Sequence, residues 1–284
     1  MKTLFLDGKK VLNNYLSNIE WNIKKMRYGK INFPGLAIVM VGNCESSKIY
    51  VQNKCKIFSK IGIDFYIFNN PSDIAEKELI ELIKDLNNNK NFCGILIQFP
   101  LPKEININNV IESINPFKDV DGFHPYNIGK LIQNNPLFRP CVGFGIISLL
   151  NYYKISIRKQ YVVVVGSSIT VGRPIVLEFL NSGATVTVCN RLTLNLKDYV
   201  KKADIVVLAT GVINVISVDW LCSNQIIIDV GIHRLRDGKL RGDIDFNAVN
   251  GKVSWITPVP GGVGPMTILS LLQNILLSLK ILGF

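Results

Sequence analysis

The sequence lacks the cysteine pattern of a disulfide scaffold or of a zinc site. Its six cysteines are scattered over 284 residues, with no CxxC pair and no group of cysteine and histidine at zinc-ligand spacing. Small disulfide-rich folds are excluded because cysteine is too dilute. We therefore expect reduced thiols that behave as small buried hydrophobes, and we expect no metal ligands.

Segments that would direct the chain to a membrane or to export are also lacking. The apolar run at the N-terminus stops at Asp7, too early for the core of a signal peptide. The Leu- and Ile-rich stretch 266–284 contains Gln273, Asn274 and Lys280, so it is expected to be a helix packed in a core rather than a membrane span. These features predict a cytoplasmic protein with no membrane partner.

Acidic residues are few relative to basic ones, with 21 Asp and Glu against 32 Lys and Arg, which gives a net charge of +11. Hydrophobic residues make up 48% and charged residues 19%, which excludes an intrinsically disordered protein. The length indicates about two domains, each with its own core. The positive charge fits nucleic acid or small polyanionic ligands. Since the lysines are spread out without interleaved aromatics, a nucleic-acid partner is disfavoured.

Short apolar runs alternate with helical segments along the chain, which predicts an α/β protein with parallel sheets. In the first half we expect strands at 36–41, 64–68 and 94–99, and helices at 9–30, 46–61 and 72–86. The passage 100–140 is expected to be rich in loops. The second half then has the pattern of a doubly wound sheet, with a helix from Pro174 and strands at 161–165, 184–188, 205–209, 226–230 and 254–256.

A turn with the character of a phosphate loop follows the strand at 161–165. Gly166 ends the strand, Ser167 and Ser168 follow, and a helix begins at Pro174. Such a turn directs backbone N–H groups and the positive end of a helix at a pyrophosphate. The usual G-x-G-x-x-G spacing is broken, because Ser168 stands at the second glycine position. A purely structural strand–turn–helix fits the pattern equally well.

The residue that would select the dinucleotide stands after the next strand. NAD enzymes carry an acid there that binds the ribose hydroxyls, whereas this chain has Arg191. An arginine can pair with a 2′-phosphate, which favours NADP. An exposed surface arginine without a ligand is the alternative.

Three segments of the first half carry more polar chemistry than packing requires. Tyr50 and Lys54 stand four apart on a predicted helix and share a face. A lysine beside an aromatic ring in a cleft can lose proton affinity and serve acid–base catalysis, while a solvated lysine is the alternative. Gln98 follows a strand at the end where ligands bind in parallel sheets. The segment 118–125 holds two acids, including Asp121, and a histidine, of which one acid and the histidine can be structural.

The segment 257–267 places three glycines between prolines. Pro260, Gly261 and Gly262 are predicted to form a rigid, sharply turned loop that a ligand can approach closely. We expect this loop to lie at the cleft between the two domains.

These segments, in this order, resemble the bifunctional methylenetetrahydrofolate dehydrogenase/methenyltetrahydrofolate cyclohydrolase family. The resemblance covers nearly the whole chain and is carried by YVQNK, GILIQFPLP, KDVDGFHPYNIGKL, DVGIHRLRDGKLRGDIDF and TPVPGGVGPMT. It implies a folate-binding catalytic domain over 1–139, a Rossmann-like NAD(P)-binding domain over 140–265, and a final helix, 266–284, that returns to the first domain. It also implies a homodimer formed through the Rossmann-like domain.

The resemblance further implies the chemistry. A hydride leaves the one-carbon bridge of 5,10-methylenetetrahydrofolate for NADP, and water then opens the methenyl product to 10-formyltetrahydrofolate, a reaction of one-carbon metabolism that supports purine biosynthesis. Lys54 would be the central catalytic residue, oriented by Gln98, with Tyr50 along the folate and Asp121 on the pterin edge. Further contacts would come, for the substrate, from Pro260, Gly261 and Gly262, and for the cofactor, from Gly166, Ser167, Ser168, Arg191 and Ile232.

Departures from the family pattern fall mostly in the cofactor half. Ser167 replaces a common arginine, Asn190-Arg191 replaces a His-Ser pair, His233 replaces an asparagine, and Val142-Gly143 replaces Thr-Pro. One arginine for the 2′-phosphate is thus lost and another gained nearby, so NAD stays possible beside NADP. A cyclohydrolase without dehydrogenase activity is the alternative function, because the folate-side set is complete. Folate and the dinucleotide are both anionic, so a positive field from the +11 charge would favour their capture without any role for nucleic acid.

Overall fold

The computed structural model describes residues 2–29, 33–43, 45–235 and 237–284, and the side chains of residues 45–50 and 53 lie outside this description. The chain divides into two compact units. One, here called the six-stranded unit, contains Met1–Asn14 and Pro140–Ser270. The other, the three-stranded unit, contains Tyr15–Arg139 and Leu271–Phe284.

The six-stranded unit is built on a parallel sheet whose strands come from both ends of the chain. In spatial order the strands are β1 (Leu4–Phe5), β11 (Trp255–Ile256), β8 (Ile226–Asp229), β7 (Ile205–Leu208), β5 (Tyr161–Val165) and β6 (Thr185–Cys189). The central strands are continuous apolar runs because both faces of a parallel sheet are covered. Val165 pairs with both Cys189 and Leu208, so the carboxyl ends of three strands share one edge.

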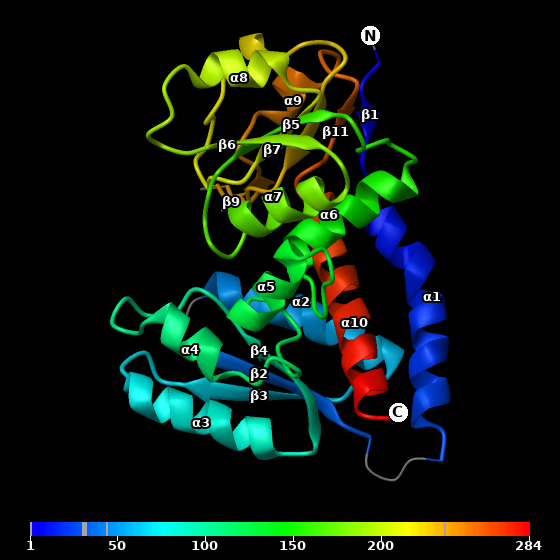
Figure 1. Ribbon diagram of the computed structural model, residues 1–284, viewed down its shortest axis with the longest axis vertical. Coiled ribbons are helices and arrows are strands. Elements are labelled where there is room, and N and C mark those ends of the chain that lie inside the picture. The colour runs from blue at the N-terminus through cyan, green and yellow to red at the C-terminus, as the bar shows by residue number, and fades with distance from the viewer. Residues whose placement is uncertain (1, 30–32, 44, 236) are drawn as a thin grey trace. The chain divides into compact units, whose positions relative to one another are not determined.

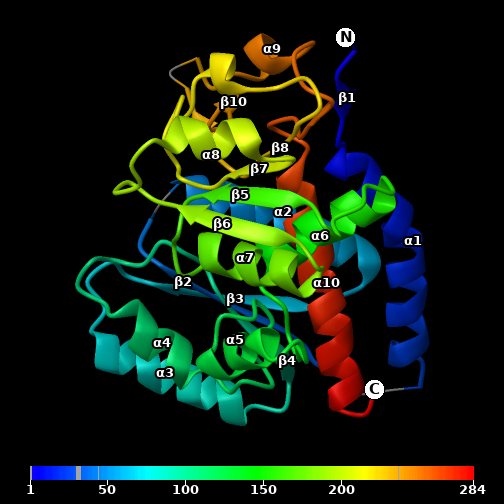
Figure 2. The ribbon, with the colours of Figure 1, turned by 45° about the horizontal axis from the view of Figure 1, so that its top comes forward.

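Helices cover both faces of this sheet, as the predicted doubly wound pattern requires. α7 (Gly172–Asn181) and α8 (Leu196–Lys202) lie on opposite faces (Figure 2). The remaining elements are α6 (Cys141–Tyr152), the 3-10 turn Val218–Trp220, α9 (Phe246–Val249) and a hairpin of β9 (His233–Arg234) and β10 (Leu240–Arg241). The hairpin lies between β8 and α9 in the chain.

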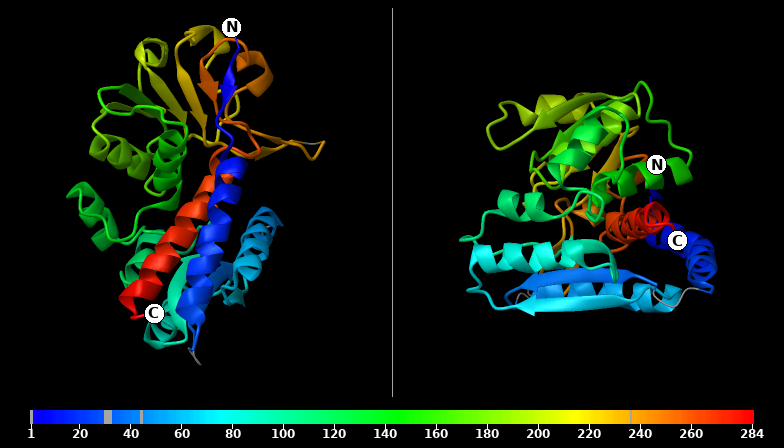
Figure 3. Two further views of the ribbon diagram at one scale, coloured as in Figure 1. Left: turned by 90° about the vertical axis from the view of Figure 1, so that its right-hand side faces the viewer. Right: turned by 60° about the horizontal axis from the view of Figure 1, so that its bottom comes forward.

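The three-stranded unit has a parallel sheet in the order β3 (Phe65–Asn70), β2 (Gly35–Val41) and β4 (Phe92–Ile97). One face packs on α3 (Glu76–Asn88) and α4 (Ile107–Ser113) through a core that includes Val39, Ile83 and Val110. α2 (Glu45–Ile61) lies on the other face (Figures 1 and 3). α5 (Pro125–Ile132) completes the unit.

Two long helices, α1 (Gly8–Arg27) and α10 (Val263–Ile281), each contribute residues to both units. In the three-stranded unit, Asn274 Nδ2 of α10 donates to the carbonyls of Val120 (2.8 Å) and Arg139 (2.9 Å), and Ser278 Oγ donates to the carbonyl of Cys93. Among the described residues α10 alone is long and apolar enough to cross a membrane, but 56% of it is buried inside the protein. The buried polar contacts are those of a core helix.

The N-terminal residues differ from the expected organisation. The sequence pattern places residues 1–139 in one domain, whereas residues 1–14 cluster with the six-stranded unit. The physical reason is that β1 adds to the sheet beside β11, with the N–H of Leu4 donating to the carbonyl of Ser254 at 2.9 Å. The loop-rich passage 100–140 also contains the two short helices α4 and α5.

Candidate active site

A buried lysine and a glutamine meet in the three-stranded unit. Lys54 lies on α2 with only 7% of its surface exposed, so it is not the solvated lysine that the sequence left open. Its Nζ donates to Gln98 Oε1 at 3.5 Å. Gln98 follows β4 at the carboxyl edge of the sheet, where its N–H donates to the carbonyl of Val39 at 2.9 Å.

The amide of Gln98 is held in one orientation. Its Nε2 donates to the carbonyl of Phe99 at 2.9 Å, which leaves Oε1 to accept from Lys54. Since the lysine ammonium can only donate and an amide oxygen can only accept, this orientation suits the pair. Tyr50 stands one turn before Lys54 on α2, but its side chain lies outside the described part of the structure, so its role stays a prediction.

The two acids of the segment 118–125 have different surroundings. Asp119 is almost completely buried and accepts hydrogen bonds from the N–H groups of Gly122 (3.1 Å) and His124 (2.8 Å) and from Asn127 Nδ2 (2.8 Å). Burial raises the pKa of the Asp119 carboxyl, against the opposing effect of these donors. Asp119 is therefore the structural acid that shapes this loop.

Lys118 and His124 are occupied by backbone contacts at either end of the same loop. Lys118 Nζ donates to the carbonyls of Leu86 (3.0 Å) and Asn89 (2.7 Å) at the end of α3, and burial lowers the pKa of its ammonium. His124 Nδ1 accepts from the N–H of Tyr126 at 3.0 Å and so caps α5. The histidine is structural, as an acceptor rather than as a donor.

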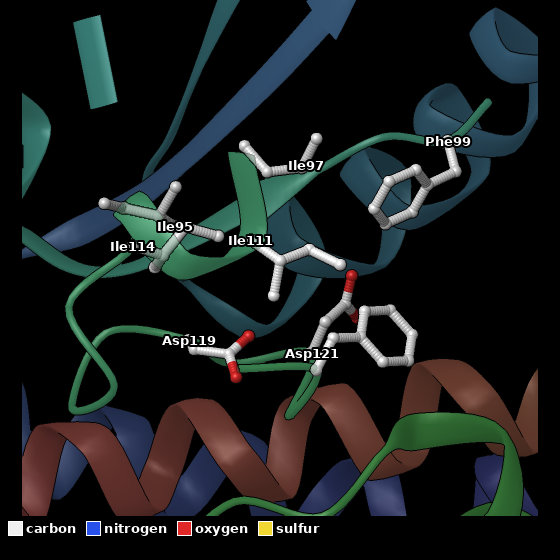
Figure 4. Close-up of a pocket in the computed structure, with 8 residues that line it drawn as sticks. Ile95, Ile97, Phe99, Ile111, Ile114, Asp119 and Asp121 are labelled. Atoms are coloured by element: carbon white, nitrogen blue, oxygen red, sulfur yellow. The ribbon is translucent and has the colours of Figure 1, made fainter. Parts of the chain in front are cut away.

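Asp121, by contrast, is half-buried and lines a small pocket (Figure 4). The carboxylate lies on the side of the loop that faces Phe99 and Ile111. Ile97 at the end of β4 and Phe123 complete the nearby wall. A carboxylate at the rim of an apolar pocket suits a flat ring whose edge carries N–H donors.

In the six-stranded unit, the turn after β5 is too tight for any residue but glycine at two points. Gly166 has a φ of +124°, and a Cβ there would lie 2.2 Å from the carbonyl oxygen of Ala209. A Cβ on Gly172 would lie 2.2 Å from the carbonyl oxygen of Gly166. Ser168 accepts from Gly172 N–H through Oγ (3.2 Å) and from Arg173 N–H through its carbonyl (3.0 Å). These contacts start α7 at Gly172, two residues before the predicted start at Pro174.

Arg191 stands on an exposed turn at the same sheet edge. The turn is closed by Asn190, whose Oδ1 accepts from the N–H of Leu192 (2.9 Å) and whose N–H donates to Thr193 Oγ1 (2.8 Å). The N–H of Gly166 donates to the carbonyl of Cys189 at 2.8 Å, which ties the two turns together. The edge therefore presents a helix N-terminus, a glycine turn and a cation, which together fit a phosphorylated dinucleotide.

Asp229, the last residue of β8, and Asp243, which follows β10, form a pair of buried carboxylates that was not predicted from the sequence. Asp229 accepts from the N–H groups of Gly231 (3.0 Å), Asp243 (2.9 Å) and Ile244 (3.1 Å). Burial raises the pKa of Asp229 to about 6, and the charge of Asp243 adds to the rise. The sequence signal is a glycine beside each acid: a Cβ on Gly231 would lie 2.0 Å from Asp243 Oδ1, and one on Gly242 would lie 1.9 Å from Asp229 Oδ2.

The loop 260–262 belongs to the six-stranded unit and packs against the start of α1. The carbonyl of Gly261 accepts from the N–H of Lys9 at 3.0 Å, and a Cβ on Gly8 would lie 1.9 Å from the carbonyl oxygen of Gly262. Gly261 has a φ of +112°, and Pro260 is exposed. The loop is as sharply turned as the sequence predicts.

The predicted site residues thus form two groups. Lys54, Gln98 and Asp121 belong to the three-stranded unit, and the predicted cofactor residues belong to the six-stranded unit together with the loop 260–262. Ile232, between Gly231 and His233, is 55% exposed. Within the described residues, no three His, Cys, Asp or Glu side chains are grouped so that they could hold a metal ion.

Comparison with known proteins gives the same division. The model of the tetrahydrofolate dehydrogenase/cyclohydrolase catalytic domain matches residues 6–121, and that of the NAD(P)-binding domain of the same family matches residues 140–282. The bifunctional protein FolD of Legionella pneumophila (strain Corby) is 52% identical over 245 residues, which is 86% of each chain.

Solved structures agree over almost the entire chain. The bifunctional FolD enzyme of Campylobacter jejuni has a TM-score of 0.94 at 40% identity and covers 98% of this chain and 99% of its own. The FolD of Trypanosoma brucei, solved with NADP and an inhibitor, has a TM-score of 0.94 at 30% identity and covers 99% and 98%. The fold and the site define a two-domain α/β enzyme with an NAD(P)-binding sheet. Together with the family matches, they show that the chain belongs to the tetrahydrofolate dehydrogenase/cyclohydrolase family. The α/β fold class and the family resemblance are both confirmed.

Proposed function

We propose that the protein oxidises 5,10-methylenetetrahydrofolate to 5,10-methenyltetrahydrofolate with NADP and then hydrolyses that product to 10-formyltetrahydrofolate. This activity belongs to one-carbon metabolism and supports purine biosynthesis. The observation that carries the proposal is the buried Lys54–Gln98 pair in a chain that is 52% identical to a bifunctional relative. In domain terms, the three-stranded unit binds folate and the six-stranded unit binds the dinucleotide.

Lys54 is the proton-handling group. When bound, NADP accepts a hydride, which leaves a cationic one-carbon bridge on the folate. Water adds to that carbon and must release a proton, and Nζ of Lys54 is the basic atom best placed to guide it. Gln98 holds Nζ in position through Oε1, because its own Nε2 is committed to the carbonyl of Phe99.

We assign substrate binding to Asp121, Tyr50 and the loop 260–262. Asp121 accepts the donors of the pterin edge by charge-assisted hydrogen bonds at the rim of its apolar pocket. We assign Tyr50 to stacking along the folate. We also assign Pro260, Gly261 and Gly262 to substrate contact, since their turn exposes backbone without side chains.

The dinucleotide is assigned to the edge of the six-stranded sheet. The turn of Gly166, Ser167 and Ser168 faces the pyrophosphate, with backbone N–H groups from the residues after Gly166, whose own N–H donates to the carbonyl of Cys189. Ile232 lies against the cofactor. Arg191 pairs with the 2′-phosphate, so NADP is preferred over NAD. The neutral Ser167 contributes no charge, which makes Arg191 the critical cation.

Lys54→Ala tests the hydrolysis. Loss of the lysine side chain is expected to lower the rate of methenyltetrahydrofolate hydrolysis by about a hundredfold or more, the usual contribution of a general acid–base group. Lys56→Ala is the matched control, since Lys56 lies exposed on the same helix. Decay of the methenyl absorbance gives the rate. Full activity in Lys54→Ala would show that another group handles the proton.

Arg191→Ala tests the cofactor preference. We expect kcat/KM with NADP to fall by about tenfold or more, while the value with NAD changes little, because only NADP has the 2′-phosphate. Reduction of the nicotinamide is followed at 340 nm. Lys202→Ala, an exposed cation at the end of α8, is the control. Equal losses of kcat/KM with both cofactors would show that Arg191 does not bind the 2′-phosphate.

A second candidate is a cyclohydrolase that has lost dehydrogenase activity. Ser167 and the broken glycine spacing favour it. The two candidates differ in nucleotide binding, so thermal unfolding with added NADP or NAD separates them: a ligand that binds only the folded state raises the midpoint. No shift with either nucleotide, together with active hydrolysis, would establish the second candidate.

We infer a cytoplasmic homodimer without nucleic-acid or membrane partners. The edge strand β6 and the turn after it support a dimer through the six-stranded unit, because they expose Val188, Leu192 (81%) and Leu194 (82%). Light scattering gives the oligomeric state, and Leu192→Ser with Leu194→Ser should shift it towards monomer. A gel shift at physiological salt checks for nucleic-acid binding.

A further inference from the structure

The dinucleotide is assigned to one edge of the six-stranded sheet, and the buried acid Asp243 accepts hydrogen bonds from a turn at this edge. Its Oδ2 accepts three hydrogen bonds from the turn after β7: from the N–H of Thr210 (2.9 Å), from Thr210 Oγ1 (2.8 Å) and from the N–H of Gly211 (3.1 Å). Its backbone carbonyl accepts from the N–H of Asn214 at 2.7 Å. One residue therefore fixes the path of the chain from 210 to 214.

The other carboxylate oxygen of Asp243 contacts His233. His233 Nε2 lies 2.8 Å from Oδ1, and the carboxylate is completely buried while the imidazole is largely so. Because an ionised carboxylate can only accept, Nε2 carries the proton in this contact. His233 is also the residue after Ile232, and Gly231 on the other side of Ile232 donates to Asp229. Both neighbours of the exposed Ile232 are thus fixed to the carboxylate pair.

Other charged groups surround the imidazole. Asp229 lies behind Asp243 and accepts from the N–H of Asp243 at 2.9 Å. On the paired strand, Arg241 stands opposite His233. Its guanidinium donates to Asn214 Oδ1 and lies 3.8 Å from Asp245. The imidazole therefore donates the hydrogen bond to Asp243 Oδ1. The guanidinium of Arg241 is engaged with Asn214 and Asp245 instead.

We propose that His233 is a positioning residue for the dinucleotide: by holding Asp243 it sets the turn at Thr210–Gly211 and the position of Ile232. A hydrogen bond to a buried carboxylate is stronger than one between neutral groups, so its loss should loosen the turn. The inference rests on the proposed nucleotide site but concerns a residue that is not itself in contact with substrate.

Two variants test the hydrogen bond. His233→Leu introduces an apolar side chain of similar size and removes the donor, whereas His233→Gln keeps a side-chain N–H donor. Arg234→Gln, an exposed neighbour on β9, is the control. For each protein we would measure amide hydrogen exchange at Thr210 and Gly211 without nucleotide, the Kd for NADP, and the rate of methenyltetrahydrofolate hydrolysis.

In His233→Leu the two amides should exchange about tenfold faster and the Kd for NADP should rise by about tenfold, the usual effect of losing a hydrogen bond to a charged group. Hydrolysis, which needs no nucleotide, should stay within about twofold. His233→Gln, which keeps a side-chain donor, should lose less than His233→Leu in both amide exchange and NADP binding.

Unchanged amide exchange in His233→Leu would overturn the proposal, as would hydrolysis that falls in step with nucleotide binding. Equal losses in His233→Gln and His233→Leu would overturn the assignment of the effect to the hydrogen bond. If the wild type binds neither NADP nor NAD, the dehydrogenase half of the proposed function fails. The exchange at Thr210 and Gly211 then still decides whether His233 positions this turn.

Discussion

Asp119 and Asp121 stand two residues apart and differ in what surrounds them. Asp119 accepts from three donors in the interior, while Asp121 lies at the rim of a pocket. Asp119→Asn should lower the free energy of unfolding by about 2 kcal/mol or more, because an amide would turn an N–H group towards buried donors. Urea unfolding measures this loss.

Asp121→Asn should have the opposite profile. Its free energy of unfolding should change by less than about 0.5 kcal/mol, since its side chain is half-buried at the rim of a pocket rather than enclosed in the interior. The KM for the folate substrate should rise by about tenfold because a charge-assisted contact becomes neutral. If Asp121→Asn unfolds as easily as Asp119→Asn, the division of roles between the two acids is wrong.

Asp229 predicts a pH dependence of stability. Its pKa is raised from 3.8 to about 6 in the folded protein, so the folded state binds its proton more tightly than the unfolded state does. The stabilisation is complete below the unfolded pKa and is lost as the pH rises through about 6, a change of about 3 kcal/mol. The unfolding free energy of the wild type relative to Asp229→Asn should therefore be greatest near the lower pKa and decline towards neutral pH.

Urea unfolding of both proteins at several pH values measures this difference. Asp237→Asn, at an exposed aspartate of the same unit, should give a flat difference. A flat difference for Asp229→Asn as well would mean that the carboxyl has an ordinary pKa in the folded protein.

The sequence could single out a residue as a site candidate where one element supplied the whole argument. Lys54 follows Tyr50 by one helical turn, and Gln98 follows a strand, so both stood out before the fold was known. The role of Asp243 could not be predicted in this way. The role of Asp243 depends on its contacts with both the turn after β7 and the hairpin after β8. These segments are distant in the sequence, so no local pattern encodes their contact.

At the scale of elements, continuous apolar runs predicted the long strands well, because a strand buried on both faces has no polar alternation to obscure it. α6 was missed since its residues are apolar on all sides and include Gly143 and Gly145, which removes the amphipathic period. The helix α3 begins at Glu76 rather than at Ser72. The two-residue strand β1 is too short to leave a pattern and exists only through its partner β11.

Two glycines in helices give predictions of opposite sign. A Cβ on Gly129 of α5 meets nothing within 4 Å, so Gly129→Ala should stabilise the protein by up to about 1 kcal/mol through helix propensity. A Cβ on Gly145 of α6 would lie 2.9 Å from the backbone of Met266, so Gly145→Ala should destabilise it by about 1–3 kcal/mol. Thermal unfolding of the two variants checks both. Stabilisation by Gly145→Ala would show that propensity outweighs packing at α6, and destabilisation by Gly129→Ala would contradict the first prediction.

At the scale of the whole molecule, the net charge of +11 should act on anionic substrates. Raising the salt concentration should raise the KM for folates several-fold with little change in kcat, because screening weakens the attraction that gathers the substrate. The dependence should be steeper for a polyglutamylated folate than for the monoglutamate. Equal slopes for the two substrates would mean that the charge does not assist capture.

The contact between the two ends of the chain has a consequence for synthesis. Thr3 Oγ1 donates to the carbonyl of Val253, 250 residues away, at 2.7 Å, and β1 completes the sheet only beside β11. The other unit needs Asn274 and Ser278 of the last helix. On the ribosome, each unit therefore lacks one of its elements until β11 or α10 has emerged. A growing chain carries an open sheet edge and an uncovered core for nearly its entire translation, and this is the period when chaperones matter most to it.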